Sequence, residues 1–155
     1  MPLMKYINII SRCAFQYRSA KFADQNLNGV QCAYILSVCK NEGISQEKLS
    51  KTLCINKSNV TRQLAVLEEK GYVERKICEK DKRVIRVYST EKARAILPRV
   101  RETFHDWNEY LIEDFTPQER ETLSSMLERI AEKAKTYTDL KADPGAAEER
   151  EPKLL

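Results

Sequence analysis

Residues 44–73 read ISQEKLSKTLCINKSNVTRQLAVLEEKGYV, and this stretch predicts two short helices joined by a tight turn. Ser45 and Asn56 are favourable N-cap residues, because their side-chain oxygens can accept a bond from the first free backbone N–H groups of a helix. The apolar residues around each cap fit a hydrophobic staple, which fixes the direction of chain entry: Ile44 with Leu49, and Ile55 with Val60. We therefore predict a helix-turn-helix.

The second of these helices is expected to bury Val60, Leu64 and Leu67 and to end at Gly71, which suits the left-handed position after a helix. Beyond Gly71 the hydrophobic period changes from about 3.6 to 2. Residues 73–77 and 84–89 read as two strands, joined by a polar connection at residues 78–83. A hairpin directly after a helix-turn-helix is a wing, so residues 44–89 are expected to form a winged helix-turn-helix.

The flanking sequence is mostly helical in pattern. Asn28 and Gln31 fit a capping box that opens a helix reaching Lys40. Further helices are expected over residues 3–22, over residues 90–115 with Pro98 inside, and over residues 116–138, where Thr116-Pro117-Gln118-Glu119 is a strong helix start. Residues 139–155 are expected to form a flexible charged tail. The predicted class is mainly α with a small β-wing (α+β), in one domain spanning residues 1–138.

Bulk composition excludes several classes of protein. The 155 residues are 42% apolar, and no uncharged apolar run is long enough to cross a bilayer. The N-terminus lacks the pattern of a signal peptide, so we expect a soluble cytoplasmic protein without a membrane partner. The chain has five cysteines without a C-x-x-C pair and one histidine, His105, so no metal site or cofactor is expected. The cysteines are expected to be small buried residues in a reducing compartment.

The residues of the second short helix point to a nucleic-acid partner. Residues 40–92 carry 13 basic and 8 acidic side chains, and no acid precedes Glu68 on this helix. Arg, Asn, Gln and Ser are the side chains that bond base edges in the major groove. We expect Ser58, Asn59 and Arg62 to contact bases and Lys57 and Thr61 to contact phosphates. The full predicted DNA-binding set of the helix is Lys57, Ser58, Asn59, Thr61, Arg62 and Gln63.

The predicted wing offers a second contact with DNA. Six basic residues lie between Arg75 and Arg86, against only two acidic ones. Arg83 could enter the minor groove from the loop, held in place by Asp81 through a charge-assisted bond. The wing residues predicted to bind DNA are Lys80, Asp81, Lys82 and Arg83.

These motifs together resemble the MarR family of bacterial transcriptional regulators. The resemblance rests on residues 45–50, 56–62 and 67–73, on Asp81-x-Arg83, and on Ser89-Thr90-Glu91-Lys92-Ala93. It covers about residues 3–138. The resemblance implies a homodimer whose first and last two helices interlock, with one winged domain on each side. Such symmetry demands a pseudo-palindromic operator.

The resemblance also implies how the protein is regulated. Members of the family usually repress genes and release DNA when a small, often aromatic, effector enters a cleft beside the DNA-binding region; others respond to cysteine oxidation. By that layout the cleft would be lined by Cys13, Tyr17, Phe104 and Trp107. The apolar stripes expected at the dimer interface carry Leu3, Ile7, Ile10, Leu123, Leu127 and Ile130.

Three alternatives are weighed against a ligand-responsive repressor. One is a redox-sensing repressor acting through Cys13, which lies roughly where peroxide-sensing relatives carry a thiol, although its flanking residues differ from theirs. Another is a winged helix that binds proteins instead of DNA, which would not need the acid-free face of residues 57–63. The third is an enzyme, disfavoured because the chain has no phosphate loop, nucleophile elbow or metal-ligand spacing.

Overall fold

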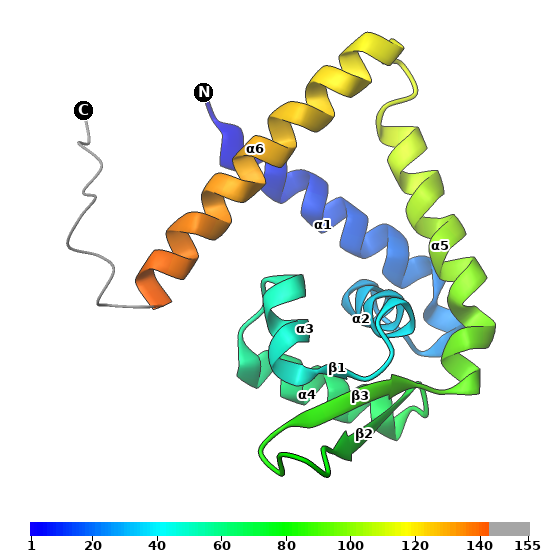
Figure 1. The fold of residues 1–155 in the computed structure, drawn as a ribbon. Coiled ribbons are helices and arrows are strands. Elements are labelled where there is room, and N and C mark those ends of the chain that lie inside the picture. Colours follow the sequence, from blue (N-terminus) through cyan, green and yellow to red (C-terminus); the bar gives the residue numbers. More distant parts are fainter. Residues whose placement is uncertain (143–155) are drawn as a thin grey trace. The chain divides into compact units, whose positions relative to one another are not determined.

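The computed structural model describes residues 1–142, with side chains to residue 138. It divides into two compact units, residues 1–111 and the residues from 112 onward. The first unit contains α1 (Leu3–Lys21), η1 (Ala23–Gln25), α2 (Gly29–Lys40), β1 (Ile44–Ser45), α3 (Gln46–Leu53), α4 (Lys57–Glu69), β2 (Val73–Ile77), β3 (Ile85–Ser89) and α5 (Glu91–Leu111) (Figure 1). The second contains α6 (Pro117–Ala142). The fold is mainly helical with a small antiparallel sheet, which confirms the predicted class.

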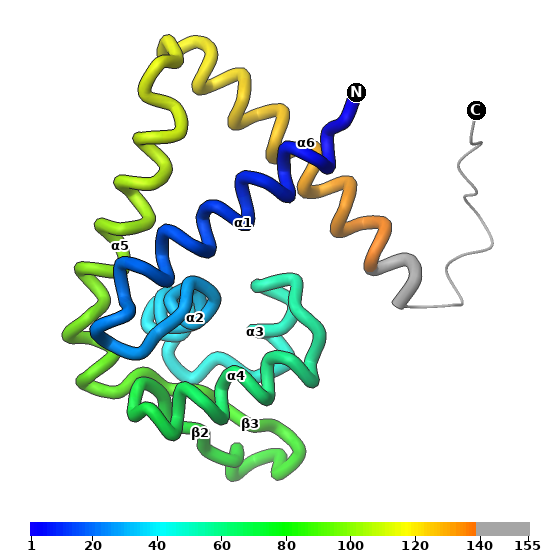
Figure 2. The backbone as a smooth tube through the Cα atoms, turned by 180° about the vertical axis from the view of Figure 1, so that it is seen from behind, coloured from blue at the N-terminus to red at the C-terminus, as the bar shows by residue number. Residues whose placement is uncertain are grey.

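The core of the first unit surrounds α2. In both views α2 lies at the centre, with α1 on one side and α3, α4 and the sheet on the other (Figure 1, Figure 2). Its inward side chains Tyr34, Ile35 and Val38 are fully buried. They belong to one continuous apolar cluster that also includes Leu64 and Leu67 of α4 and Val87 of β3. Burial of these side chains, at about 1.5–3 kcal/mol each, holds the helix-turn-helix against the sheet.

The helix-turn-helix has the predicted caps. The Ser45 hydroxyl accepts from the Lys48 N–H at 3.1 Å, and the Asn56 side chain accepts from the Asn59 N–H at 2.8 Å. Gly71 takes a φ of +76° after α4. The N–H groups of Gly71 and Tyr72 donate to the carbonyls of Glu68 and Leu67, at 2.9 and 2.8 Å, which is the Schellman arrangement. The sequence predicted these caps correctly because each cap depends on hydrogen bonds within one turn of the chain.

The sheet contains one strand that the sequence did not predict. Its order is β1-β3-β2, and all pairs are antiparallel. β1 is only two residues long and pairs Ile44 with Val87 and Ser45 with Arg86. Gly43, with a φ of +74°, precedes it, and a Cβ at that position would lie 3.2 Å from the Tyr88 ring. A pairing between segments so distant in sequence leaves no periodic pattern, so only the folded chain reveals it.

Two of the predicted helices end at other residues in the structure. The helix expected to reach Phe115 ends at Leu111, because the chain turns there with the Phe115 N–H bonded to the Ile112 carbonyl. The last helix, expected to end at residue 138, continues to Ala142. The rest of the predicted tail lies outside the described residues. No helix in the described part of the chain is long and apolar enough to span a membrane.

The cysteines are less buried than predicted. All five are free, but only Cys32 is buried, while Cys39 and Cys78 are intermediate and Cys13 and Cys54 are exposed. Cys54 lies at the left-handed C-cap of α3, with a φ of +53°, in the turn of the helix-turn-helix. The expectation failed because it rested on composition, and residue type alone does not say which face of a helix or turn a thiol occupies.

Candidate nucleic-acid interface

The first two turns of α4 present the predicted polar face. Val60, Leu64 and Leu67 are completely buried, so the opposite side of the helix faces outward. Lys57, Ser58, Thr61 and Arg62 are exposed, whereas Asn59 and Gln63 are half-buried. The first turn carries no acid, which leaves the positive end of the helix dipole uncompensated. This face favours an anionic partner.

Hydrogen bonds within α4 orient several of these side chains. The Ser58 hydroxyl donates to Asn56 Oδ1 at 2.9 Å, and the Thr61 hydroxyl donates to the Lys57 carbonyl at 3.0 Å. Arg62 donates one N–H to Asn59 Oδ1 at 3.3 Å. A guanidinium carries five N–H donors, so this bond positions Arg62 while leaving it the capacity to bond a base edge.

Two members of the predicted set are placed differently from the rest. Gln63 turns partly inward, and its Oε1 is buried without a hydrogen-bond partner among the described residues. Lys57 pairs across the turn with Glu47 of α3 at 3.6 Å, although both side chains are exposed and the pair is weak. Neither feature could be read from spacing along α4, because the Lys57 pair depends on where α3 lies and the enclosure of Gln63 depends on packing around α4.

The predicted contact in the wing loop is present. The Asp81 carboxylate accepts from the Arg83 backbone N–H at 3.0 Å and from Arg83 Nε at 3.3 Å. The Arg83 side chain is 92% exposed, and Lys80 and Lys82 are exposed beside it. We call residues 78–83 the wing tip. It projects three cationic side chains that no core residue covers.

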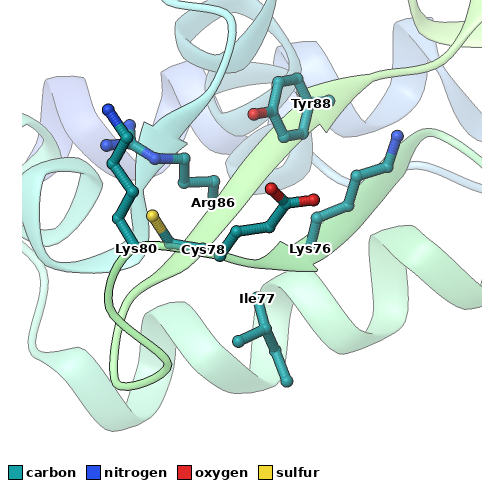
Figure 3. A pocket seen from close by; sticks show the side chains of 7 residues that line it. Lys76, Ile77, Cys78, Lys80, Arg86 and Tyr88 are labelled. Atoms are coloured by element: carbon teal, nitrogen blue, oxygen red, sulfur yellow. The ribbon is translucent and has the colours of Figure 1, made fainter.

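A shallow groove of about 400 Å³ runs along one face of the wing. Figure 3 shows Lys76, Cys78, Lys80, Arg86 and Tyr88 on this face, while Ile77 points to the opposite side. The Cys78 thiol lies where the Asp81 backbone N–H, the Arg86 side chain and the Lys80 backbone N–H favour its thiolate, so its pKa is lowered. Cys78 is a feature that sequence reasoning missed, and its position beside Arg86 follows only from the hairpin register.

Two of the six basic wing residues, Arg75 and Arg86, bond groups outside the hairpin. Arg75 donates to the Glu68 carboxylate from Nε at 2.9 Å and from a terminal nitrogen at 2.7 Å. This interaction lowers the pKa of Glu68. Arg86 donates to the Gly43 carbonyl at 2.9 Å. The six basic residues between 75 and 86 therefore differ in whether their side chains already bond another part of the fold.

The residues proposed to line an effector cleft divide into two groups. Tyr17 of α1 stacks on Trp107 of α5 with ring centroids 5.0 Å apart, and the Arg18 guanidinium lies 4.8 Å above the Phe104 ring. These contacts bring Tyr17, Phe104 and Trp107 to one α1–α5 contact region. Cys13 lies about one turn earlier on α1 and is exposed.

The residues expected at a dimer interface include exposed apolar side chains on each unit. On α1, Ile10 is 47% exposed, and Leu3 and Ile7 are half-buried. On α6, Leu127 is 47% and Ile130 is 37% exposed, and Leu123 is half-buried. Their neighbours Met4, Ile9 and Met126 are exposed as well. Exposed apolar surface of this kind is typical of interaction sites in general.

The helix-turn-helix, the three-stranded sheet and the cationic wing tip define a winged helix-turn-helix protein. Comparisons with known proteins narrow this class. A MarR family model matches residues 27–85. A solved MarR transcriptional regulator from Methanosarcina mazei is 30% identical, with a TM-score of 0.79, over 85% of this chain and 95% of that one.

Two further relatives agree. An HTH-type transcriptional regulator of Bacillus subtilis, YybA, is 27% identical over 83% of this chain and 85% of its own length. A MarR family regulator from Listeria monocytogenes, solved in complex with a 26-mer DNA, is 25% identical with a TM-score of 0.84, over 90% of this chain and 93% of that one. The chain belongs to the MarR family of transcriptional regulators.

Proposed function

We propose that this regulator binds double-stranded DNA as a homodimer, with α4 as the recognition helix in the major groove and the wing tip at the minor groove. The observation that carries this proposal is the outward face of α4, where four exposed polar or basic residues lie with no acid before Glu68. A DNA-bound solved relative of the same fold supports it. A protein-binding winged helix would not require this charge distribution.

The contacts have distinct roles in this proposal. Ser58, Asn59 and Arg62 read base edges, because amide and guanidinium groups form paired bonds to adenine and guanine. Lys57, Thr61 and the wing-tip lysines bond phosphates, which carry affinity without sequence information. Arg83, directed by Asp81, enters the minor groove. Gln63 takes a secondary role, since part of its side chain is enclosed.

The regulatory part of the proposal is a ligand-responsive repressor in the cytoplasm. A dimer formed through the exposed stripes of α1 and α6 would place two recognition helices on a pseudo-palindromic operator. An aromatic effector would bind beside Tyr17, Phe104 and Trp107, where stacked rings already offer an apolar surface. Oxidation of the exposed Cys13 is the alternative signal, and mass spectrometry of Cys13 after mild peroxide distinguishes the two. Enzymatic activity forms no part of this proposal.

The decisive experiment selects bound sequences from a random duplex pool and then measures variants on the selected operator. Arg62→Ala is expected to weaken specific binding by roughly 1–3 kcal/mol, and Lys82→Ala to weaken binding to all duplexes alike, with a salt slope smaller by about 1. Lys133→Ala on α6 removes the same charge far along the chain and serves as the control. Unchanged affinity of both test variants for every duplex at moderate salt would contradict the proposal.

A further inference from the structure

The wing is attached to the helix-turn-helix by an ion pair that a backbone hydrogen bond supplements. Glu68, near the end of α4, accepts three bonds from Arg75 of β2: from the backbone N–H at 2.8 Å, from Nε at 2.9 Å and from a terminal nitrogen at 2.7 Å. The Arg75 side chain is 24% exposed and that of Glu68 is 38% exposed. Charge-assisted bonds to a planar guanidinium fix direction as well as distance. β2 is an edge strand, so Glu68 also satisfies one of its outward N–H groups.

A second arginine holds the opposite face of the hairpin. Arg75 is the cross-strand partner of the buried Val87, whereas Arg86 is the partner of Lys76, one position along. Successive residues of a strand point to opposite faces, so Arg75 and Arg86 leave the wing on opposite sides. Arg86 donates to the carbonyl of Gly43, the residue that leads into β1 and α3. We call Glu68, Arg75, Arg86 and Gly43 the wing brace.

Little else holds the outer part of the wing. Ile77 is 65% exposed, and the cations of the wing tip are exposed. The apolar core reaches β2 at Val73, two residues before Arg75. Beyond Val73 on β2 and the buried Val87 on β3, the hairpin direction depends on its own ladder, on the pairing of β3 with β1 and on the brace.

We infer that Glu68, Arg75 and Arg86 are positioning residues, which hold the wing tip at the angle to α4 that lets both elements bind DNA together. In this inference Arg75 and Arg86 bond other parts of the protein, and the DNA contacts of the wing are Lys80 and Lys82 at phosphates and Arg83 in the minor groove. The inference rests on the proposed function and deepens it, because it divides the basic residues of the wing into two kinds.

Glu68→Gln separates positioning from direct contact, because the two roles predict opposite signs. If Arg75 binds phosphate, removing its carboxylate partner frees a cation, and DNA affinity and the salt slope both rise. If the pair positions the wing, affinity for the selected operator falls about tenfold, and the slope falls by about 1–2 as wing-tip phosphate contacts are lost. Glu69→Gln removes the same charge from the next residue, and it is expected to change neither the affinity for the operator nor the salt slope.

Two further variants sharpen the distinction. Arg75→Lys keeps the charge but loses the paired geometry, so it is expected to behave like Glu68→Gln, whereas a phosphate contact would tolerate lysine. In a background that carries Lys80→Ala, Lys82→Ala and Arg83→Ala together, Glu68→Gln is expected to weaken binding by less than a further twofold, because the contacts that the brace positions are already gone. In an Arg62→Ala background its full effect is expected to remain, since α4 itself is not displaced.

A measurement without DNA tests the brace independently of the proposed function. The Cys78 N–H donates to the Val84 carbonyl near the start of the wing tip. In Glu68→Gln, hydrogen exchange over residues 76–86 is expected to quicken at least about threefold, with exchange along α4 unchanged. Unchanged hydrogen exchange over these residues in Glu68→Gln would overturn the inference, and so would tighter DNA binding by this variant. If the wild-type protein binds no duplex, the proposed function fails, and the exchange result alone decides whether the brace holds the wing.

Discussion

At the scale of single residues, the thiols of Cys78 and Cys32 have opposite surroundings. Burial raises the pKa of Cys32 to about 11, while backbone N–H groups and Arg86 lower the pKa of Cys78. A lowered pKa gives more thiolate at a given pH, and the thiolate is the reactive form. Near pH 8, iodoacetamide is therefore expected to label Cys78 while Cys32 stays unmodified in the folded protein.

Peptide mass spectrometry over a time course checks this expectation. Arg86→Gln should slow labelling of Cys78, and the exposed Cys54 is an internal reference for simple accessibility. Labelling of Cys32 at the rate of Cys78 would show that burial does not protect it in solution.

At the scale of elements, the start of α4 depends on one side chain. Asn56 accepts both from the Asn59 N–H and from the Ser58 hydroxyl, so its loss leaves a backbone donor without its cap. Asn56→Ala is expected to lower the free energy of unfolding by about 1 kcal/mol, and Asn56→Gly by only a few tenths. Urea unfolding at fixed protein concentration measures both, and equal losses in the two variants would argue against the cap.

The attachment of α5 to the end of α1 predicts a dependence on acid. Arg99 of α5 bonds both carboxylate oxygens of Asp24, at 2.9 and 3.0 Å, and also the Lys21 carbonyl. Its bond to Arg99 is the main reason that the pKa of Asp24 falls to about 2. Because the folded pKa lies below the unfolded value of about 3.9, this contribution to stability is present above pH 4 and is lost as pH falls toward 2.

Asp24→Asn removes that contribution. The difference in urea midpoint between wild type and Asp24→Asn is expected to be largest above about pH 5 and to close between about pH 4 and pH 2. A difference that stays constant across this range would show that the carboxylate charge does not stabilise the α1–α5 contact.

At the scale of the whole molecule, the exposed apolar side chains of α6 predict self-association. Leu127→Glu combined with Ile130→Glu would place carboxylates in the proposed dimer interface, where burying unpaired charge is costly. Analytical ultracentrifugation is expected to find a dimer for the wild type and a monomer for this variant. Ile77→Glu, which changes an exposed apolar residue of β2, is the control and should remain dimeric. A wild-type monomer at all concentrations would refute the dimer.

The predictions that succeeded concern signals confined to a few consecutive residues. The caps at Asn28, Ser45, Asn56 and Thr116, and the stop at Gly71, all appear where the sequence placed them. Each is set by bonds within one helical turn, so no tertiary contact was needed to foresee it. The prediction of a hairpin at residues 73–89 was correct for a similar reason. Its residues alternate with a period of 2, which differs from the helical period and can be read along the chain.

The sequence by itself therefore determined that residues 44–89 form a winged helix-turn-helix with a basic outer face, since short-range caps, staples and periodicity specify those elements. Only the tertiary structure decided which polar residues of that unit remain available. β1, the enclosed Gln63, and the bonding of Arg75 to Glu68 all depend on segments meeting across the fold. Spacing along the chain records where a side chain lies on its own element, but its partner is chosen by packing between elements.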